Sequence, residues 1–143
     1  MNWPIRTHKE KILITSPFSI RWGQLHKGID ISTHYGENVY PAHNGVVVFA
    51  GKYKGYGNLI IISHLNKYTT YYAHLSTLNV KKGMKVTEKN LIVKTGESGS
   101  LTGPTLHFEL REDDVPVDPL IILPKNYHVK IADKHDFEKI HNG

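Results

Sequence analysis

The sequence predicts an all-β fold, a sheet or a sandwich, for a chain of 143 residues that is long enough for one domain. Its apolar runs are short and strand-sized, and glycine, proline and asparagine turns separate them. No stretch before residue 124 combines a helical period with capping residues. Numerous short strands without intervening helices are typical of all-β domains.

The expected strands are spread along most of the chain. We predict strands at 11–15, 27–32, 46–50, 58–64, 67–75, 91–95 and 105–110. Glycines 45 and 51 bracket the third strand, and a turn at 55–57 precedes the fourth.

The character of the chain changes after Pro124, where 132–140 could form a short helix with a thin apolar stripe. We therefore predict a domain at 1–123, which includes a short N-terminal extension, and a tail at 124–143.

Composition excludes several classes of function. The net charge of +5 is scattered, with no lysine cluster longer than Lys81-Lys82, so we expect no nucleic-acid partner. No apolar run is long enough to span a membrane, and residues 1–11 hold no export signal. Because the chain has no cysteine, histidine and carboxylate side chains must hold any metal ion.

Three residues on or directly before two expected strands can carry metal chemistry: His26, Asp30 and His107. In extended backbone, even spacings share a face, so His26 and Asp30 point the same way. Two imidazoles and one carboxylate, with no fourth protein ligand evident, are typical of a catalytic zinc site. Taken alone the spacing is weak evidence, because it occurs by chance and Asp30 could instead cap a turn.

The expected strand at 105–110 shows the same alternation of polar and apolar residues. Thr105, His107 and Glu109 share one face, and the intervening apolar residues share the other. Glu109 could therefore orient His107 as a metal ligand, or it could be a solvated carboxylate on the strand surface.

The segments around these residues resemble the LytM-type, or lysostaphin-like, family of peptidoglycan zinc metallopeptidases. The resemblance covers roughly residues 14–120 in the correct order and rests on ITSPFSIR (14–21), LHKGIDI (25–31), GYGN (55–58), YAHLS (72–76), VKKG (80–83), TGP (102–104), LHFE (106–109) and VDP (117–119). It implies a small antiparallel β-sheet domain with an open groove over the sheet. It also implies cleavage of peptidoglycan stem or cross-bridge peptides in the cell envelope, periplasmic or extracellular, or by a phage-borne enzyme.

The resemblance also assigns roles to individual residues. It makes His26, Asp30 and His107 ligands of Zn²⁺, and it makes His74 a catalytic histidine that assists the attacking water or stabilises the charged intermediate. Without the resemblance, His74 would be interpreted as a strand residue that hydrogen-bonds a neighbour. Two further histidines, His43 and His64, are expected at the surface, and we expect the protein to be a monomer.

One position departs from the family pattern. The last motif of the family reads His-x-His, and its first histidine belongs to the catalytic apparatus, whereas this chain has Thr105. Threonine cannot take up a proton at neutral pH, so we expect reduced endopeptidase activity. The alternative is an inactive pseudo-peptidase that binds the cell wall or an envelope protein as a regulatory module. A natural substitution and one introduced in the laboratory fit the sequence equally well.

Overall fold

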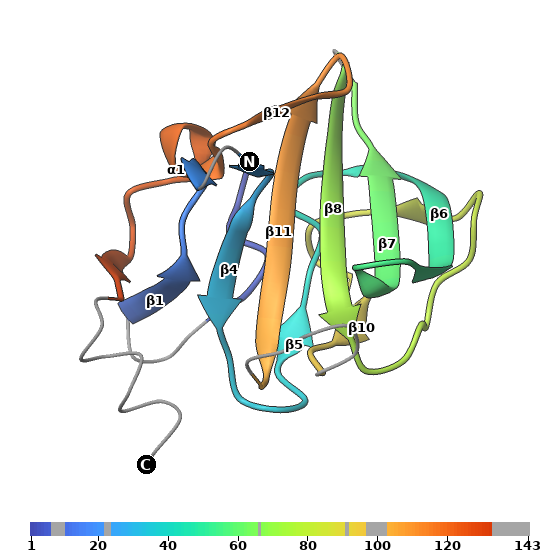
Figure 1. The fold of residues 1–143 in the computed structure, drawn as a ribbon. Coiled ribbons are helices and arrows are strands. Elements are labelled where there is room, and N and C mark those ends of the chain that lie inside the picture. The colour runs from blue at the N-terminus through green and yellow to red at the C-terminus, as the bar shows by residue number, and fades with distance from the viewer. Residues whose placement is uncertain (7–10, 22–23, 66, 91, 97–102, 133–143) are drawn as a thin grey trace.

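The computed structural model describes residues 1–6, 11–21, 24–65, 67–90, 92–96 and 103–132. In this part of the chain the main sheet has nine strands, in the order β13-β1-β4-β11-β8-β7-β6-β9, with β12 paired to β11 (Figure 1). Its strands are β1 (Lys11–Ser16), β4 (Ile29–Ser32), β6 (Gly45–Tyr53), β7 (Gly57–Ser63), β8 (Tyr68–Leu75), β9 (Lys85–Val86), β11 (Thr105–Glu112), β12 (Val115–Val117) and β13 (His128–Ile131).

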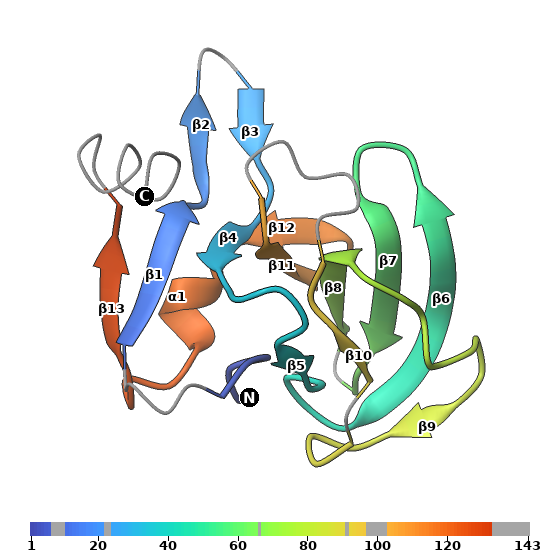
Figure 2. The ribbon, with the colours of Figure 1, turned by 90° about the horizontal axis from the view of Figure 1, so that it is seen from below.

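Two small ribbons accompany the main sheet. One pairs β2 (Ser19–Arg21) with β3 (Gln24–His26), and the other pairs β5 (Asn38–Val39) with β10 (Val93–Lys94). The view from below shows that the β2–β3 ribbon projects beyond the ends of β1 and β4 (Figure 2). The last residue of β3 is His26, so this ribbon supplies one of the expected metal ligands.

The all-β fold class is confirmed, and each expected strand has a counterpart: six lie in the main sheet, and the strand expected at 91–95 corresponds to β10 of the second small ribbon. Most described strand pairs are antiparallel, and β13 pairs with β1 in parallel. This last strand lies in the expected tail, so the described part of the tail joins the sheet. The helix expected at 132–140 lies almost wholly outside the described residues.

A one-turn helix, α1 (Pro119–Ile122), is present where no helix was expected. Asp118 caps its N-terminus, with Oδ1 accepting the backbone N–H of Leu120 at 3.0 Å, and Pro119 occupies the first turn. A single turn is too short to produce an apolar period, so the sequence pattern could not reveal it. No helix in the described part of the chain is long and apolar enough to cross a membrane.

The alternation along β4 and β11 directs one side-chain face of each strand into the core. Ile29 and Ile31 of β4 are fully buried, as are Leu106, Phe108 and Leu110 of β11. The opposite face of these two strands therefore carries Asp30, His107 and Glu109, as the sequence predicted. The core fixes the register of β4 against β11, because a slip of one residue would exchange the two faces.

A candidate metal centre

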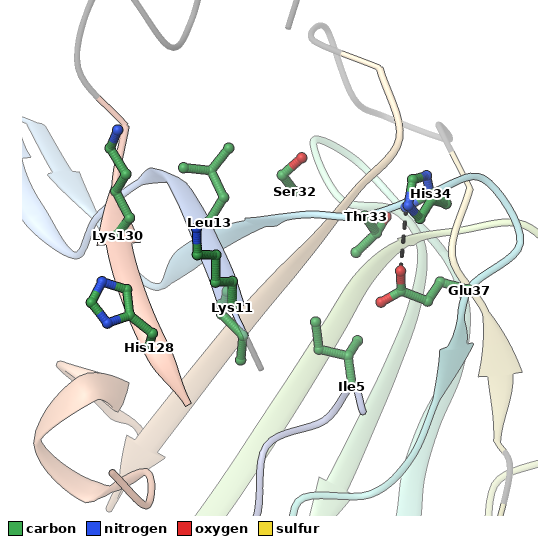
Figure 3. Close-up of a pocket in the computed structure, with 10 residues that line it drawn as sticks. Ile5, Lys11, Leu13, Ser32, Thr33, His34, Glu37, His128 and Lys130 are labelled. Carbon is green, nitrogen blue, oxygen red and sulfur yellow. Dashed lines mark hydrogen bonds between the residues drawn. The ribbon is translucent and has the colours of Figure 1, made fainter. Parts of the chain in front are cut away.

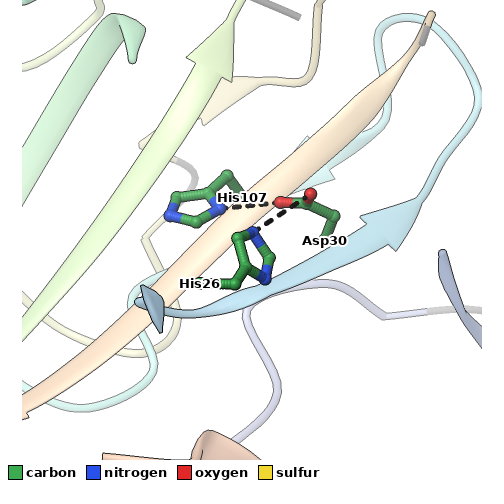
Figure 4. Close-up of side chains that lie close together, drawn as sticks. All are labelled: His26, Asp30 and His107. Atoms are coloured by element: carbon green, nitrogen blue, oxygen red, sulfur yellow. Dashed lines mark hydrogen bonds and ion pairs between the residues drawn. The ribbon is translucent and has the colours of Figure 1, made fainter. Parts of the chain in front are cut away.

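The pairing of β4 with β11 brings two of the expected ligands together. Asp30 lies directly opposite His107 in this antiparallel pair, and Asp30 Oδ1 is 2.7 Å from His107 Nδ1. His26 approaches from the end of β3, with its Nε2 3.4 Å from Asp30 Oδ2 (Figure 4). One donor atom from each of the three residues lies within 4.8 Å of the other two. The arrangement can therefore hold one metal ion.

Gly28 lets the chain between His26 and Asp30 pass close to β11. A Cβ atom added at Gly28 would lie 2.3 Å from the carbonyl oxygen of Phe108 and 2.7 Å from Cγ of Glu109. These separations are well below ordinary van der Waals contact, so only glycine fits without a shift of one strand. The glycine in this segment thus sets the distance between the ligands of β3–β4 and the ligand of β11.

Hydrogen bonds at the far nitrogen of each histidine fix the tautomers. His26 Nδ1 lies 2.9 Å from the carbonyl oxygen of Pro17, which can only accept, so Nδ1 carries the proton. His107 Nε2 lies 2.7 Å from Oε2 of Glu109 and likewise donates. Lone pairs on His26 Nε2 and His107 Nδ1 can then face Asp30, as metal coordination requires.

The short contact between Asp30 and His107 requires a positive charge. Two lone pairs 2.7 Å apart would repel, so either a proton or a metal ion must lie between Oδ1 and Nδ1. Burial opposes ionisation of Asp30, but hydrogen bonds from His107 and His26 outweigh it and hold the pKa of Asp30 well below its usual range. Burial also opposes protonation of His107, but Asp30 and Glu109 outweigh it and raise its pKa to about 9. These residues suit a divalent cation, since the donor set is anionic and preassembled.

His74 reaches the same pocket because β8 bulges at this point. Between the pairs Asn58–Leu75 and Ile60–Tyr72, two residues of β8 oppose one of β7. His74 has φ of 64°, a left-handed conformation that few residues other than glycine adopt. Its N–H donates to the carbonyl of Tyr56 at 2.9 Å, and its ring centroid lies 5.9 Å from that of His107.

These side chains line one open pocket of about 270 Å³. The described lining residues are Leu25, His26, Lys27, Asp30, Gly55, Tyr56, His74, His107 and Glu109. The turn at 55–57 reaches this pocket through Gly55 and Tyr56. Lys27 was missed, because nothing in the sequence distinguishes a lysine beside a ligand from any other surface lysine.

Thr105 lies near the centre but uses its hydroxyl elsewhere. It is almost fully buried, and Oγ1 donates to the backbone carbonyl of Ile31 at 2.9 Å. It is not among the described residues that line the metal pocket. Thr105 therefore offers the pocket neither a base nor a proton donor.

The expectation of a surface position for His64 is wrong. Its exposed fraction is 8%, and Nδ1 donates to the carbonyl of Asn44 at 2.8 Å. Nε2 therefore accepts from the hydroxyl of Thr70 at 2.7 Å, which in turn accepts from the hydroxyl of Tyr72. His64 thus closes a buried hydrogen-bond chain remote from the metal ligands.

A second pocket, of about 390 Å³, lies where β1 and β13 meet the segment after β4 (Figure 3). Its basic side chains, Lys11, Lys130 and His128, are exposed, and its carboxylate, Glu37, accepts the backbone N–H of His34 at 3.4 Å. It holds none of the three candidate ligands, so the metal chemistry belongs to the smaller pocket.

The fold is that of a LytM-type peptidase domain. A sequence profile of Peptidase family M23 matches residues 24–119, and the chain belongs to that family.

Three similar proteins illustrate the range of this fold. The chain is 37% identical over 131 residues to the DD-carboxypeptidase/endopeptidase Mpg of Neisseria meningitidis serogroup B, covering 87% of the chain and 30% of Mpg. A zinc-containing peptidase from Vibrio cholerae superposes with a TM-score of 0.73 at 35% identity, covering 81% of this chain and 37% of that one. The SpoIIQ–SpoIIIAH pore-forming complex gives a TM-score of 0.71 at 25% identity, covering 87% and 91%. The chain thus spans about a third of the length of the Neisseria and Vibrio proteins.

Proposed function

We propose that this chain is a zinc-dependent endopeptidase of peptidoglycan peptides whose activity is reduced by Thr105. The observation that carries the proposal is the convergence of one donor atom each from His26, Asp30 and His107 within 4.8 Å. The other ring nitrogen of each histidine donates to an oxygen, which leaves His26 Nε2 and His107 Nδ1 for ligation. Three protein ligands are typical of catalytic zinc sites, whereas structural sites usually have four.

The three ligands would hold the ion, and proton transfer would require a further side chain of the pocket. A bound zinc ion supplies Lewis-acid polarisation of the scissile carbonyl and activates water for attack at neutral pH. The His74 imidazole lies beside His107 at the edge of the pocket, where it can accept a proton from the attacking water or donate to the charged oxygen of the intermediate. Among the described residues of the pocket, His74 is the imidazole that remains after the ligands are assigned.

Thr105 leaves this machinery with one imidazole where the family pattern has two. Its hydroxyl donates to Ile31, so it cannot replace a base. A positioned general acid or base contributes about 10²–10⁴ in rate. We therefore expect slow turnover supported by zinc and His74.

The substrate class and the location follow from the family and its relatives. Mpg is named for carboxypeptidase and endopeptidase activity, which supports peptides of peptidoglycan as the substrate. The expected location is the cell envelope, periplasmic or extracellular, unless the protein is phage-borne. A monomer suffices, because all three candidate ligands come from one chain.

A second candidate function is a catalytically inactive module that binds the cell wall or an envelope protein. Thr105 favours it, and so does the similarity to the SpoIIQ–SpoIIIAH complex, which is named for pore formation. The retained ligand set favours the enzyme, because a pure binding module does not require a metal site.

Hydrolysis of purified peptidoglycan by the zinc-loaded protein, with products identified by mass spectrometry, tests the proposal. The matched variants are Asp30→Asn, which removes the ligand charge, and Thr105→His, which restores the family pattern. We expect slow cleavage by the given chain, faster cleavage by Thr105→His and none by Asp30→Asn. Cleavage by Thr105→His alone would favour the inactive module, and equal cleavage by Asp30→Asn would refute the metal mechanism.

A further inference from the structure

A buried carboxylate lies behind His107, on the side away from Asp30. Glu109 is fully buried, and its Oε2 accepts from His107 Nε2 at 2.7 Å and from the Tyr56 hydroxyl at 2.8 Å. Its Oε1 accepts from Arg111 Nε at 2.9 Å and Nη2 at 2.6 Å. All four of these partners donate, so both oxygens of the Glu109 carboxylate act as acceptors.

This carboxylate determines which nitrogen of His107 faces the ion. Because the Glu109 carboxylate accepts at this position, His107 Nε2 keeps its proton, and Nδ1 is the nitrogen that is left to present a lone pair to a bound ion beside Asp30. The other histidine ligand differs, since His26 donates to the neutral carbonyl of Pro17. The negative charge therefore supports one of the two imidazoles and makes it the stronger base.

Tyr56 links this carboxylate to the catalytic histidine. Its hydroxyl donates to Glu109 and its carbonyl accepts the N–H of His74 at 2.9 Å. Its ring centroid lies 5.7 Å from that of His107, while Arg111 Nη2 reaches its hydroxyl at 3.3 Å. The guanidinium of Arg111 stacks 4.1 Å over the ring of Tyr71, which limits its movement.

We infer that Glu109, held by Arg111 and Tyr56, is a positioning residue that orients His107 and raises the affinity of the centre for zinc. The inference rests on the proposed zinc function. Tyr56, which is hydrogen-bonded to Glu109 and to the backbone of His74, also positions His74 relative to the ligands.

Zinc affinity, measured by competition with a chelator, tests this role in the whole chain. Glu109→Gln keeps the shape and removes the charge, and we expect it to bind zinc about 10–100-fold more weakly. Tyr56→Phe keeps Glu109 and Arg111, so we expect a smaller loss of several-fold. The control is Thr70→Val, which removes a buried hydroxyl from the His64 chain on the other face of the sheet and should lower the melting temperature without changing zinc affinity.

The His107 Nε2–H proton in the zinc-loaded protein gives a spectroscopic signature. A hydrogen bond to a carboxylate should place its NMR resonance downfield, and Glu109→Gln should move it upfield. Unchanged zinc affinity in Glu109→Gln, or an equal loss in Thr70→Val, would overturn the inference while leaving the zinc site in place. Absence of zinc binding by the unmodified chain would overturn the proposed function itself.

Discussion

Replacing Gly28 by alanine should disturb the metal centre, although Gly28 is not one of the candidate ligands. The new Cβ would lie 2.3 Å from the carbonyl oxygen of Phe108, whereas real Cβ contacts begin near 3.0 Å. The nearest atom belongs to the backbone of Phe108, so the β3–β4 segment and β11 must move apart by roughly 1 Å. Overpacking of this kind costs about 2–3 kcal/mol in the free energy of unfolding.

Gly28 lies between the candidate ligands His26 and Asp30, so the displacement also moves these ligands relative to His107. We expect Gly28→Ala to bind zinc about tenfold more weakly or worse, because metal sites tolerate little misplacement of their ligands. Urea unfolding of the zinc-free protein measures the change in the free energy of unfolding, and competition with a chelator measures the change in zinc affinity.

Gly51 of β6 provides the control, since it is a glycine of the main sheet whose surroundings leave room for a Cβ atom. A Cβ added there would meet the ring of Phe49 at 3.5 Å, which is ordinary contact. Gly51→Ala should therefore be neutral or stabilise the fold by about 0.5 kcal/mol. Equal effects of Gly28→Ala and Gly51→Ala on unfolding and on zinc affinity would refute the close approach of the strands at the site.

Three further predictions concern histidines in different roles. His74→Ala should lower peptidoglycan cleavage by about 10²–10⁴-fold and leave zinc affinity unchanged; a parallel loss of zinc would show that His74 is a ligand instead. At pH 7, zinc binding should release about one proton, because the pKa of His107 in the zinc-free protein is raised to about 9, and calorimetry in buffers of different ionisation enthalpy measures that release. No dependence on the buffer would contradict this protonation. Burial lowers the pKa of His64, so its contribution to stability is present above about pH 6.5 and is lost as the pH falls below it. The melting temperature should accordingly drop between pH 7 and pH 5, and His64→Gln should weaken that dependence; an identical pH profile for the variant would show that another group is responsible.

The sequence could predict the Asp30–His107 pair because a strict period of two governs both strands. Ile29 and Ile31 are committed to the core, and so are Leu106 and Phe108, which leaves the polar residues on the opposite face. The apolar pattern was therefore sufficient to predict that Asp30 and His107 lie on the same face of the sheet.

The position of His74 could not be predicted from that pattern. Simple alternation from buried Tyr72 would send His74 to the core side, and the bulge with its positive φ turns it to the groove instead. Bulges depend on pairing between strands, which a single strand sequence does not reveal. Only the family resemblance indicated His74.

The burial of His64 and the pairing of the edge strand β13 could not be predicted from the apolar pattern either. His64 directly follows β7, where a surface position is usual, yet Asn44 and Thr70 satisfy both ring nitrogens and permit burial. The last strand, β13, alternates polar and apolar residues over only four positions, and most of its side chains are exposed. It lies in the part of the chain that was expected to be a tail, so its pairing with β1 was not predicted.

A crystal structure of the zinc-loaded protein, with anomalous scattering recorded at the zinc absorption edge, tests the proposed centre most directly. We predict a single strong peak in the pocket, within about 2.0–2.2 Å of His26 Nε2, His107 Nδ1 and a carboxylate oxygen of Asp30. His107 should still donate its Nε2–H to Glu109. A pocket without such a peak, or an ion held by a different set of atoms, would contradict the zinc centre and the function proposed for it.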